Sequence, residues 1–393
     1  MKMIYLDNAA TTIPCNDAIL PFQNPNNYFN ASSIYNASVE LSDNINYVRN
    51  SIKSYLGMTT GEIYFTNGAT ESNNWLIQGL INYYKSNCSG KFNYNTGIFD
   101  TFIPHIITSN IEHDSILNVL KAYDECDIEV TYLPVNEYGE INIYDLIKSI
   151  KENTVLVSIM YSNNEIGTVQ PIEDVIDICH KRGILVHSDI TQDFGKIELA
   201  TIVGDKIDFL SASAHKFFGP KGVGFLYVKD TSRFSPLIIG GGQEDGFRAG
   251  TLNAPAILGM NNALYYCQQN YLDDLNKSHN YIYDLNSYLR SLLRVFFNDN
   301  DVLINTPNFG HILNFSLRNI DSEPLVLQLS DKNIYVSTGS ACNTGSLEPS
   351  HVLTAIGCPE NFINGAIRVS FTINNTKEEL YDFVTELSNL YYF

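Results

Sequence analysis

The amino-acid sequence predicts an α/β protein in which helices cover both faces of a mainly parallel β-sheet, with a smaller α+β domain after it. Short runs rich in β-branched and aromatic residues alternate with helical patterns from residue 63 to residue 228. Such alternation is typical of βαβ units, whose crossover helices cover a parallel sheet. Beyond residue 228 the alternation stops at a Gly-rich segment. The 393 residues are enough for about two domains with sizeable cores.

The individual elements of the first part follow in a regular order. Strands are expected at 63–66, 106–109, 129–135, 154–160, 184–189, 208–213 and 222–228. Helices are expected at 71–84 and near 115–124, and a long helical stretch runs from about 254 to 297. Segment 86–102 has no clear period, which predicts a surface loop.

The C-terminal part mixes the two kinds of structure. Strand patterns at 311–317, 334–338 and 366–371 are followed by a helical pattern that reaches the last residues. This mixture is the basis for expecting a smaller α+β domain.

The charge balance excludes several classes of partner. There are 24 Lys and Arg against 43 Asp and Glu, a formal net charge of −19. A charge this negative repels phosphate backbones and anionic lipids, so neither nucleic acid nor a membrane surface is expected as a partner. No apolar run approaches the roughly 20 residues of a membrane-spanning helix. The N-terminal sequence resembles no targeting signal, so we expect a cytoplasmic protein.

The cysteines do not form a disulfide or zinc pattern. Seven are widely spaced, and no Cys-x-x-Cys pair occurs. Reduced thiols and no metal site are therefore expected. Cys342 lies in a run of small residues, STGSACNTGS, which exposes a thiol and suits a nucleophile. The alternative is a cysteine buried under a turn.

Unusual polar residues follow five of the predicted strands. In open α/β sheets ligands bind at the carboxyl ends of strands, and the residues there are Gly68-Ala69-Thr70, His113, Asn164, Asp189 with Gln192, and Ser213 with His215 and Lys216. The first group opens a helix and can cradle a phosphate, although an ordinary helix cap by Thr70 is the simpler alternative. Each of the others also has an ordinary structural explanation. Because parallel strands end at one edge, however, we expect a single convergent site.

The chemistry of these groups indicates a cofactor. A lysine amine among hydroxyl and imidazole groups can bind an aldehyde covalently, and a deep Asp keeps a pyridine nitrogen protonated. Together with a phosphate cradle, these are the requirements of pyridoxal 5′-phosphate (PLP). Further along, Arg368 can grip a substrate carboxylate, unless it forms only an ion pair.

Long motifs along nearly the whole chain resemble a known family. They include YLDNAATT, FTNGATESNN, HSDITQDFGK, SASAHKFFGPKG, FRAGT and STGSACNTGSLEPSHVL. On these the chain is identified as similar to the NifS/IscS-like cysteine desulfurases of the long-loop class, within the class-V aminotransferases. The resemblance implies the PLP-dependent transferase fold type I, with a seven-stranded sheet. It also implies a large PLP-binding domain at 16–255 and a small domain formed by 1–15 and 256–393.

The resemblance implies a role for each matching residue. Lys216 would bind the cofactor aldehyde, Asp189 would face the pyridine nitrogen, and His113 would stack on the ring and carry protons. The remaining cofactor contacts would come from Ala69, Thr70, Asn164, Gln192, Ser213 and His215. Asn164 and Arg368 would bind the substrate, L-cysteine, and Cys342 would accept its sulfur. Thr251 would reach the phosphate of the other subunit of a homodimer.

The reaction implied is removal of sulfur from L-cysteine, giving alanine and a persulfide that is passed to an acceptor or an iron–sulfur scaffold protein. Tyr35 and Asp245 depart from the usual His and Arg of the family, which puts its usual partners in doubt. An aminotransferase, a selenocysteine lyase and a non-catalytic PLP-binding protein remain as alternatives. A dehydrogenase is disfavoured, since no Gly-x-Gly-x-x-Gly turn follows the first strand.

Overall fold

The computed structural model describes residues 2–87, 89–93, 98–124, 127–273, 275–338 and 349–392. Its centre is a seven-stranded sheet in the order β2-β10-β9-β8-β7-β5-β6. The strands are β2 (Glu62–Thr66), β5 (His105–Ser109), β6 (Glu129–Leu133), β7 (Thr154–Ser158), β8 (Leu185–Asp189), β9 (Phe209–Ser213) and β10 (Gly224–Val228). Strand β10 pairs antiparallel with both β2 and β9, and the other neighbouring strands pair parallel. The mainly parallel sheet of the sequence prediction is confirmed.

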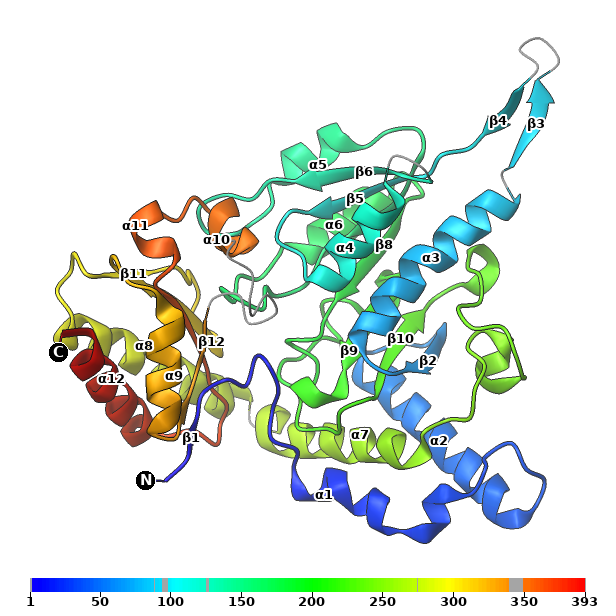
Figure 1. Ribbon diagram of the computed structural model, residues 1–393. Coiled ribbons are helices and arrows are strands. Elements are labelled where there is room, and N and C mark those ends of the chain that lie inside the picture. Colours follow the sequence, from blue (N-terminus) through cyan, green and yellow to red (C-terminus); the bar gives the residue numbers. More distant parts are fainter. Residues whose placement is uncertain are drawn as a thin grey trace.

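Helices cover both faces of the large sheet (Figure 1). The helices are α2 (Asn36–Tyr55), α3 (Ala69–Asn87), α4 (Asp114–Tyr123), α5 (Ile143–Ser149), α6 (Ile172–His180) and α7 (Ala254–Cys267). Strand β2 shows which helices cover which face. Ile63 and Phe65 pack with α2, α6 and α7 on one face, whereas Tyr64 packs with α3 and α4 on the other. Strands buried on both faces are mostly apolar, which explains the hydrophobic runs in the sequence.

A second sheet lies beside the first (Figure 1). It is antiparallel, in the order β11-β12-β15-β14. Its strands are β11 (Val302–Ile304), β12 (Ile312–Leu317), β14 (Ser337–Thr338) and β15 (Ala366–Ser370). The helices of this part are α8 (Leu275–Phe296), α9 (Ser322–Asp331), α10 (His351–Ala355), α11 (Glu360–Ile363) and α12 (Lys377–Tyr392).

The N-terminal segment joins the two parts. Strand β1 (Ile4–Tyr5) pairs with β13 (Ile334–Tyr335), so Ile4 and Leu6 lie in the core formed by α8, α9 and α12. The chain then crosses to the large sheet and forms the short helix α1 (Asn16–Ile19), which packs against α7. The domain boundaries at residues 15 and 255 stay a prediction.

Two local predictions need correction. Segment 86–102 is not a loop, since β3 (Ser89–Asn93) and β4 (Ile98–Thr101) form an antiparallel hairpin that projects from the body (Figure 1). Its strands, of five and four residues, are too short to show a clear period of two. The helical stretch from 254 to 297 is also interrupted, because α7 passes into a π-helical turn at Gln268–Leu272, where the Asp273 N–H donates to the Gln268 carbonyl at 2.9 Å.

Candidate active site

The carboxyl ends of β2, β5, β7, β8 and β9 meet at one cavity of about 370 Å³. The predicted site residues that line it are Ala69, Thr70, His113, Asn164, Asp189, Gln192, Ser213, His215, Lys216 and Arg368. The predicted convergence of these residues is therefore confirmed. Their individual roles in binding and catalysis stay a prediction.

Asp189 lies at the end of β8 and is 7% exposed. Its Oδ1 accepts from the Thr191 N–H at 3.0 Å, and its Oδ2 accepts from Asn73 Nδ2 at 2.8 Å. Asn73 is itself held, since its Oδ1 accepts from the Ser211 hydroxyl at 2.5 Å. The carboxylate consequently has one fixed orientation at the cavity wall.

The Lys216 amine is held by the N-terminal segment. Its Nζ donates to the carbonyl oxygens of Ala9 at 2.6 Å and Ala10 at 2.7 Å, and both of these residues line the cavity. The amine is thus aimed by backbone groups more than 200 residues away in the chain. A lysine placed in this way can bind an aldehyde or move a proton.

His113 has a defined tautomer because it caps α4. Its Nδ1 accepts from the Ser115 N–H at 3.1 Å, so the proton of the neutral ring is on Nε2. Burial lowers the pKa of His113 below its usual 6.5, and the positive charge of Lys216 also lowers it. The carboxylate of Asp189 acts in the opposite direction and raises the pKa. The ring is therefore neutral at pH 7 and presents a donor.

The turn between β2 and α3 forms a cradle. Gly68 has φ +144°, and a Cβ on it would lie 3.0 Å from the Ser213 hydroxyl oxygen. That oxygen accepts from the Ala69 N–H at 2.7 Å, which fixes the first turn of the helix. Helix N-termini that begin with a glycine turn favour anions, so a phosphate fits here.

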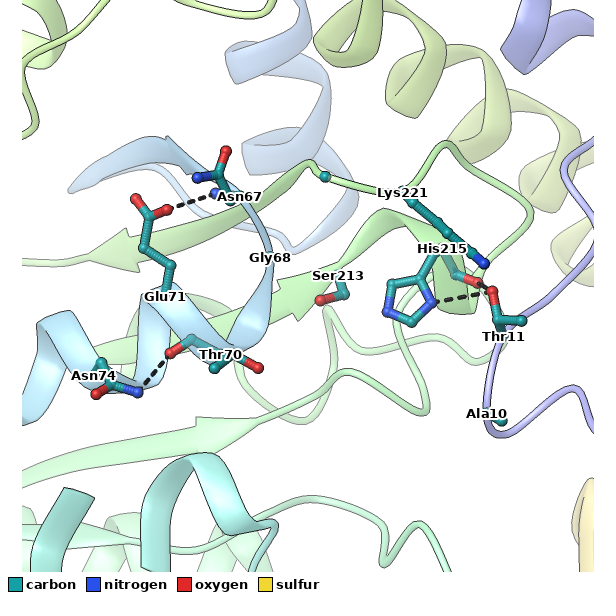
Figure 2. Close-up of a pocket in the computed structure, with 11 residues that line it drawn as sticks. Ala10, Thr11, Asn67, Gly68, Thr70, Glu71, Asn74, Ser213, His215 and Lys221 are labelled. Carbon is teal, nitrogen blue, oxygen red and sulfur yellow. Dashed lines mark hydrogen bonds between the residues drawn. The ribbon is translucent and has the colours of Figure 1, made fainter. Parts of the chain in front are cut away.

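A second cavity of about 800 Å³ opens beside the cradle and shares Thr70, Ser213 and His215 with the first (Figure 2). His215 Nδ1 and the Thr11 hydroxyl are 3.1 Å apart. Burial, together with the positive charges of Lys216 and Lys221, lowers the pKa of His215 to about 4. His215 is therefore a neutral hydrogen-bonding group at this end.

Arg368, on β15, brings the second sheet to the cavity and is 2% exposed. Its Nη1 donates to the Asn164 carbonyl and its Nη2 to Asp7 Oδ1, both at 2.9 Å. Arg368 therefore forms an ion pair with Asp7, which was the alternative expected from the sequence. Among the described residues, however, the buried Nε has no partner.

The residues present fit PLP. Three residues that line this cavity carry a buried polar atom with no hydrogen-bond partner within the described part of the chain, which indicates a polar ligand. The atoms are Thr191 Oγ1, Gln192 Oε1 and Arg368 Nε. An aldehyde-binding amine, a carboxylate and an anion cradle surround the same space. The described residues contain no cluster of His, Cys, Asp or Glu that could hold a metal ion.

One predicted residue does not line this cavity, and another lies outside the part of the chain that the structure describes. Thr251 is exposed and lies outside its lining. Cys342 lies outside the described residues.

The sequence argument missed several contributors. Ala9, Ala10 and Thr11 belong to a segment with no strand or helix pattern. Asn73 could have been found, because it lies three residues after Thr70 and hence near the same face of a helix.

Comparison with known proteins places the chain in a family. The class-V aminotransferase model matches residues 4–383. Cysteine desulfurase IscS of Clostridium botulinum is 37% identical and covers 98% of this chain and 93% of the relative. The IscS of Methanosarcina thermophila is 38% identical over 96% of this chain and 89% of the relative. A solved NifS-like protein superposes with a TM-score of 0.86 at 34% identity, over 99% of each chain.

These matches cover both sheets and the cavity between them. Among the described residues, no helix is both long and apolar enough to cross a membrane. The chain therefore belongs to the class-V aminotransferase family, among its PLP-dependent cysteine desulfurases of the IscS/NifS type.

Proposed function

We propose that this protein takes sulfur from L-cysteine and holds it as a persulfide on Cys342. The sulfur atom leaves the β-carbon of L-cysteine and bonds to the Cys342 sulfur, while the β-carbon gains the hydrogen that makes alanine. The Cβ–S bond breaks as the S–S bond forms, so no outside oxidant or reductant is needed. The observation that carries the proposal is the convergence of Lys216, Asp189 and Arg368 on one cavity.

Each end of the cavity offers its own contacts to PLP. The phosphate would lie in the cradle of Ala69, Thr70, Ser213 and His215, and Lys216 would bind the aldehyde. Asp189 would face the pyridine nitrogen, and Gln192 and Asn164 would contact the ring's hydroxyl side. When bound, PLP supplies an electron sink next to the substrate's α-carbon.

The chain's own residues would then move the protons. The Lys216 amine takes the proton from the substrate's α-carbon, and the neutral His113 ring, with its proton on Nε2, serves as a proton carrier at the same cavity. Each such proton transfer typically raises the reaction rate by roughly 10²–10⁴-fold.

The test is the mass of the Cys342 peptide after the PLP-loaded protein has reacted with L-cysteine and been trapped by alkylation. A gain of one sulfur on that peptide is expected. The peptides of Cys15 and Cys358 are internal controls, since burial raises the pKa of both thiols. With PLP bound, a Cys342 peptide of unchanged mass would refute the proposal.

Arg368 is proposed to bind the substrate carboxylate, and Arg368→Lys tests this. Lysine keeps the charge and loses the planar fork, including the unpartnered Nε. We expect KM for L-cysteine to rise about tenfold, as for one lost charged hydrogen bond, with a smaller change in kcat. Alanine release measures both constants. A KM equal to that of the wild type would contradict the role.

A homodimer is proposed, in which Thr251 reaches the phosphate of the partner subunit. Exposed apolar side chains gather in the N-terminal segment and α2, among them Ile13, Leu20, Tyr28, Ile34 and Val39, and such surfaces favour association. Light scattering should give twice the 44.1 kDa chain mass. A monomer under assay conditions would refute this arrangement.

The sulfur acceptor is proposed to be a protein, either a sulfur carrier or an iron–sulfur scaffold, in the cytoplasm. Cys15, Cys179, Cys267 and Cys358 are all free thiols, which suits a reducing compartment. Asp245 is exposed on the Gly-rich loop, so an acceptor that docks there must tolerate an acid. Transfer of labelled sulfur from Cys342 to a candidate acceptor in a reducing buffer would test this assignment.

A further inference from the structure

Helix α10 begins directly after the part of the chain that carries Cys342. From its position we infer that Ser350 and His351 are positioning residues. They hold the chain directly after the Cys342 segment on the loops that follow β5 and β7, and so fix the point from which the thiol must reach the substrate. The inference rests on the proposed role of Cys342 as sulfur acceptor.

The first contact is a buried hydrogen bond from Ser350 to the loop after β7. The Ser350 hydroxyl donates to Glu165 Oε2 at 2.5 Å and also caps α10 by accepting from the Leu353 N–H at 3.2 Å. Glu165 follows Asn164, which lines the cavity. Its own N–H donates to Asn163 Oδ1 at 2.8 Å, so the backbone that carries the acceptor of the Ser350 bond is held in place.

The second contact goes to the loop after β5. His351 Nε2 lies 3.0 Å from the Glu112 carbonyl oxygen, and because a carbonyl only accepts, Nε2 carries the proton. The Glu112 side chain accepts from the Ser109 hydroxyl at 2.6 Å and from the Met160 N–H at 3.0 Å. Glu112 is followed by His113, so His351 is tied to the turn that places this ring.

A small separate core supports both bonds. It consists of Ile111, Ile166, Val352, Leu353 and Ala366. Ile111 and Ile166 come from the loops after β5 and β7, whereas Val352 and Leu353 belong to α10. The start of α10 is therefore packed on the two loops that line the cavity, and not only on the second sheet.

This anchoring limits the space open to the Cys342 thiol. Cys342 precedes Ser350 by eight residues, which span at most about 29 Å when fully extended. If the end at Ser350 shifts, the space within reach of the Cys342 thiol shifts by the same amount. Since a misplacement of about 1 Å can cost about 10²-fold in rate, the anchor should affect sulfur transfer more than substrate binding.

Ser350→Ala separates these two steps. We expect the spectral change on adding L-cysteine to the PLP-loaded protein to stay within about twofold of wild type. The single-turnover rate of sulfur gain on Cys342 should fall about tenfold, and Ser350→Thr, which keeps the hydroxyl, should restore it to within about threefold.

Asp321→Ala is the matched control. Asp321 caps α9 by accepting from the Glu323 N–H at 3.0 Å, so this variant also loses a helix cap, but α9 packs in the other core of the second part. It should transfer sulfur at the wild-type rate. Equal slowing in both variants, or equal slowing of binding and transfer in Ser350→Ala, would overturn the inference.

A double-mutant cycle with Glu165→Ala tests the bond itself. If Ser350 acts through Glu165, the double variant loses no more transfer rate than the slower single variant. Full additivity of the two losses would overturn the inference. A wild-type protein that binds PLP yet gains no sulfur on Cys342 would instead overturn the proposed function, and this inference with it.

Discussion

Lys216→Ala is expected to abolish covalent PLP binding and to slow sulfur transfer to Cys342 by at least about 10³-fold. The variant removes both the amine that binds the aldehyde and the base that takes the α-proton, and a positioned base alone contributes about 10²–10⁴-fold. Visible absorbance of the purified protein reports the covalent bond, and the mass of the Cys342 peptide reports the transfer.

Lys148→Ala is the control for this change, because Lys148 stacks on Tyr144 at the surface of α5. It should bind PLP and transfer sulfur as the wild type does. Added methylamine should restore part of the Lys216→Ala rate, since it fits where the side chain was. Wild-type transfer by Lys216→Ala without any amine would show that another group is the base.

Cys342→Ser is expected to keep PLP and the spectral response to L-cysteine while alanine release falls by at least about 10³-fold, about 4 kcal/mol of barrier. The spectral response to L-cysteine needs only Lys216 and the cavity, whereas alanine release needs a thiolate to take the sulfur. A serine hydroxyl is too weak an acid to supply an equivalent nucleophile at neutral pH.

The outcome of Cys342→Ser also separates the rival activities. Unchanged product formation in this variant would favour an aminotransferase or a lyase that needs no thiol acceptor. Cys358→Ser is the matched control, because that thiol is half-buried near Asn305, and burial raises its pKa. It should remain fully active.

Much of the fold could be predicted because its signals are local. The strands of the large sheet are short runs, and those buried on both faces, such as β7 and β10, are visible as mostly apolar segments. The hairpin β3–β4 escaped prediction because its strands are too short to show a period. The π-helical turn after α7 escaped as well, because its residues continue a helical pattern.

The candidate site likewise contains residues that could be predicted from the sequence and others that could not. Asp189, Ser213 and Lys216 could be assigned to one edge because parallel strands end together, and the cavity confirms this. The partners that orient them could not be assigned. Ala9 and Ala10 hold the Lys216 amine, and Thr11 contacts His215, from a segment with no periodic pattern.

The sequence by itself thus determined the α/β class, the edge of the sheet where the site lies and the kind of cofactor chemistry, since these depend on residue type and on periodicity along the chain. Only the tertiary structure decided how the site is held together. The N-terminal segment aims Lys216, β15 brings Arg368 to Asn164, and α10 docks Ser350 on Glu165. These contacts join residues 185 to 207 positions apart, and such pairings are selected by packing of the whole chain, not by any local pattern.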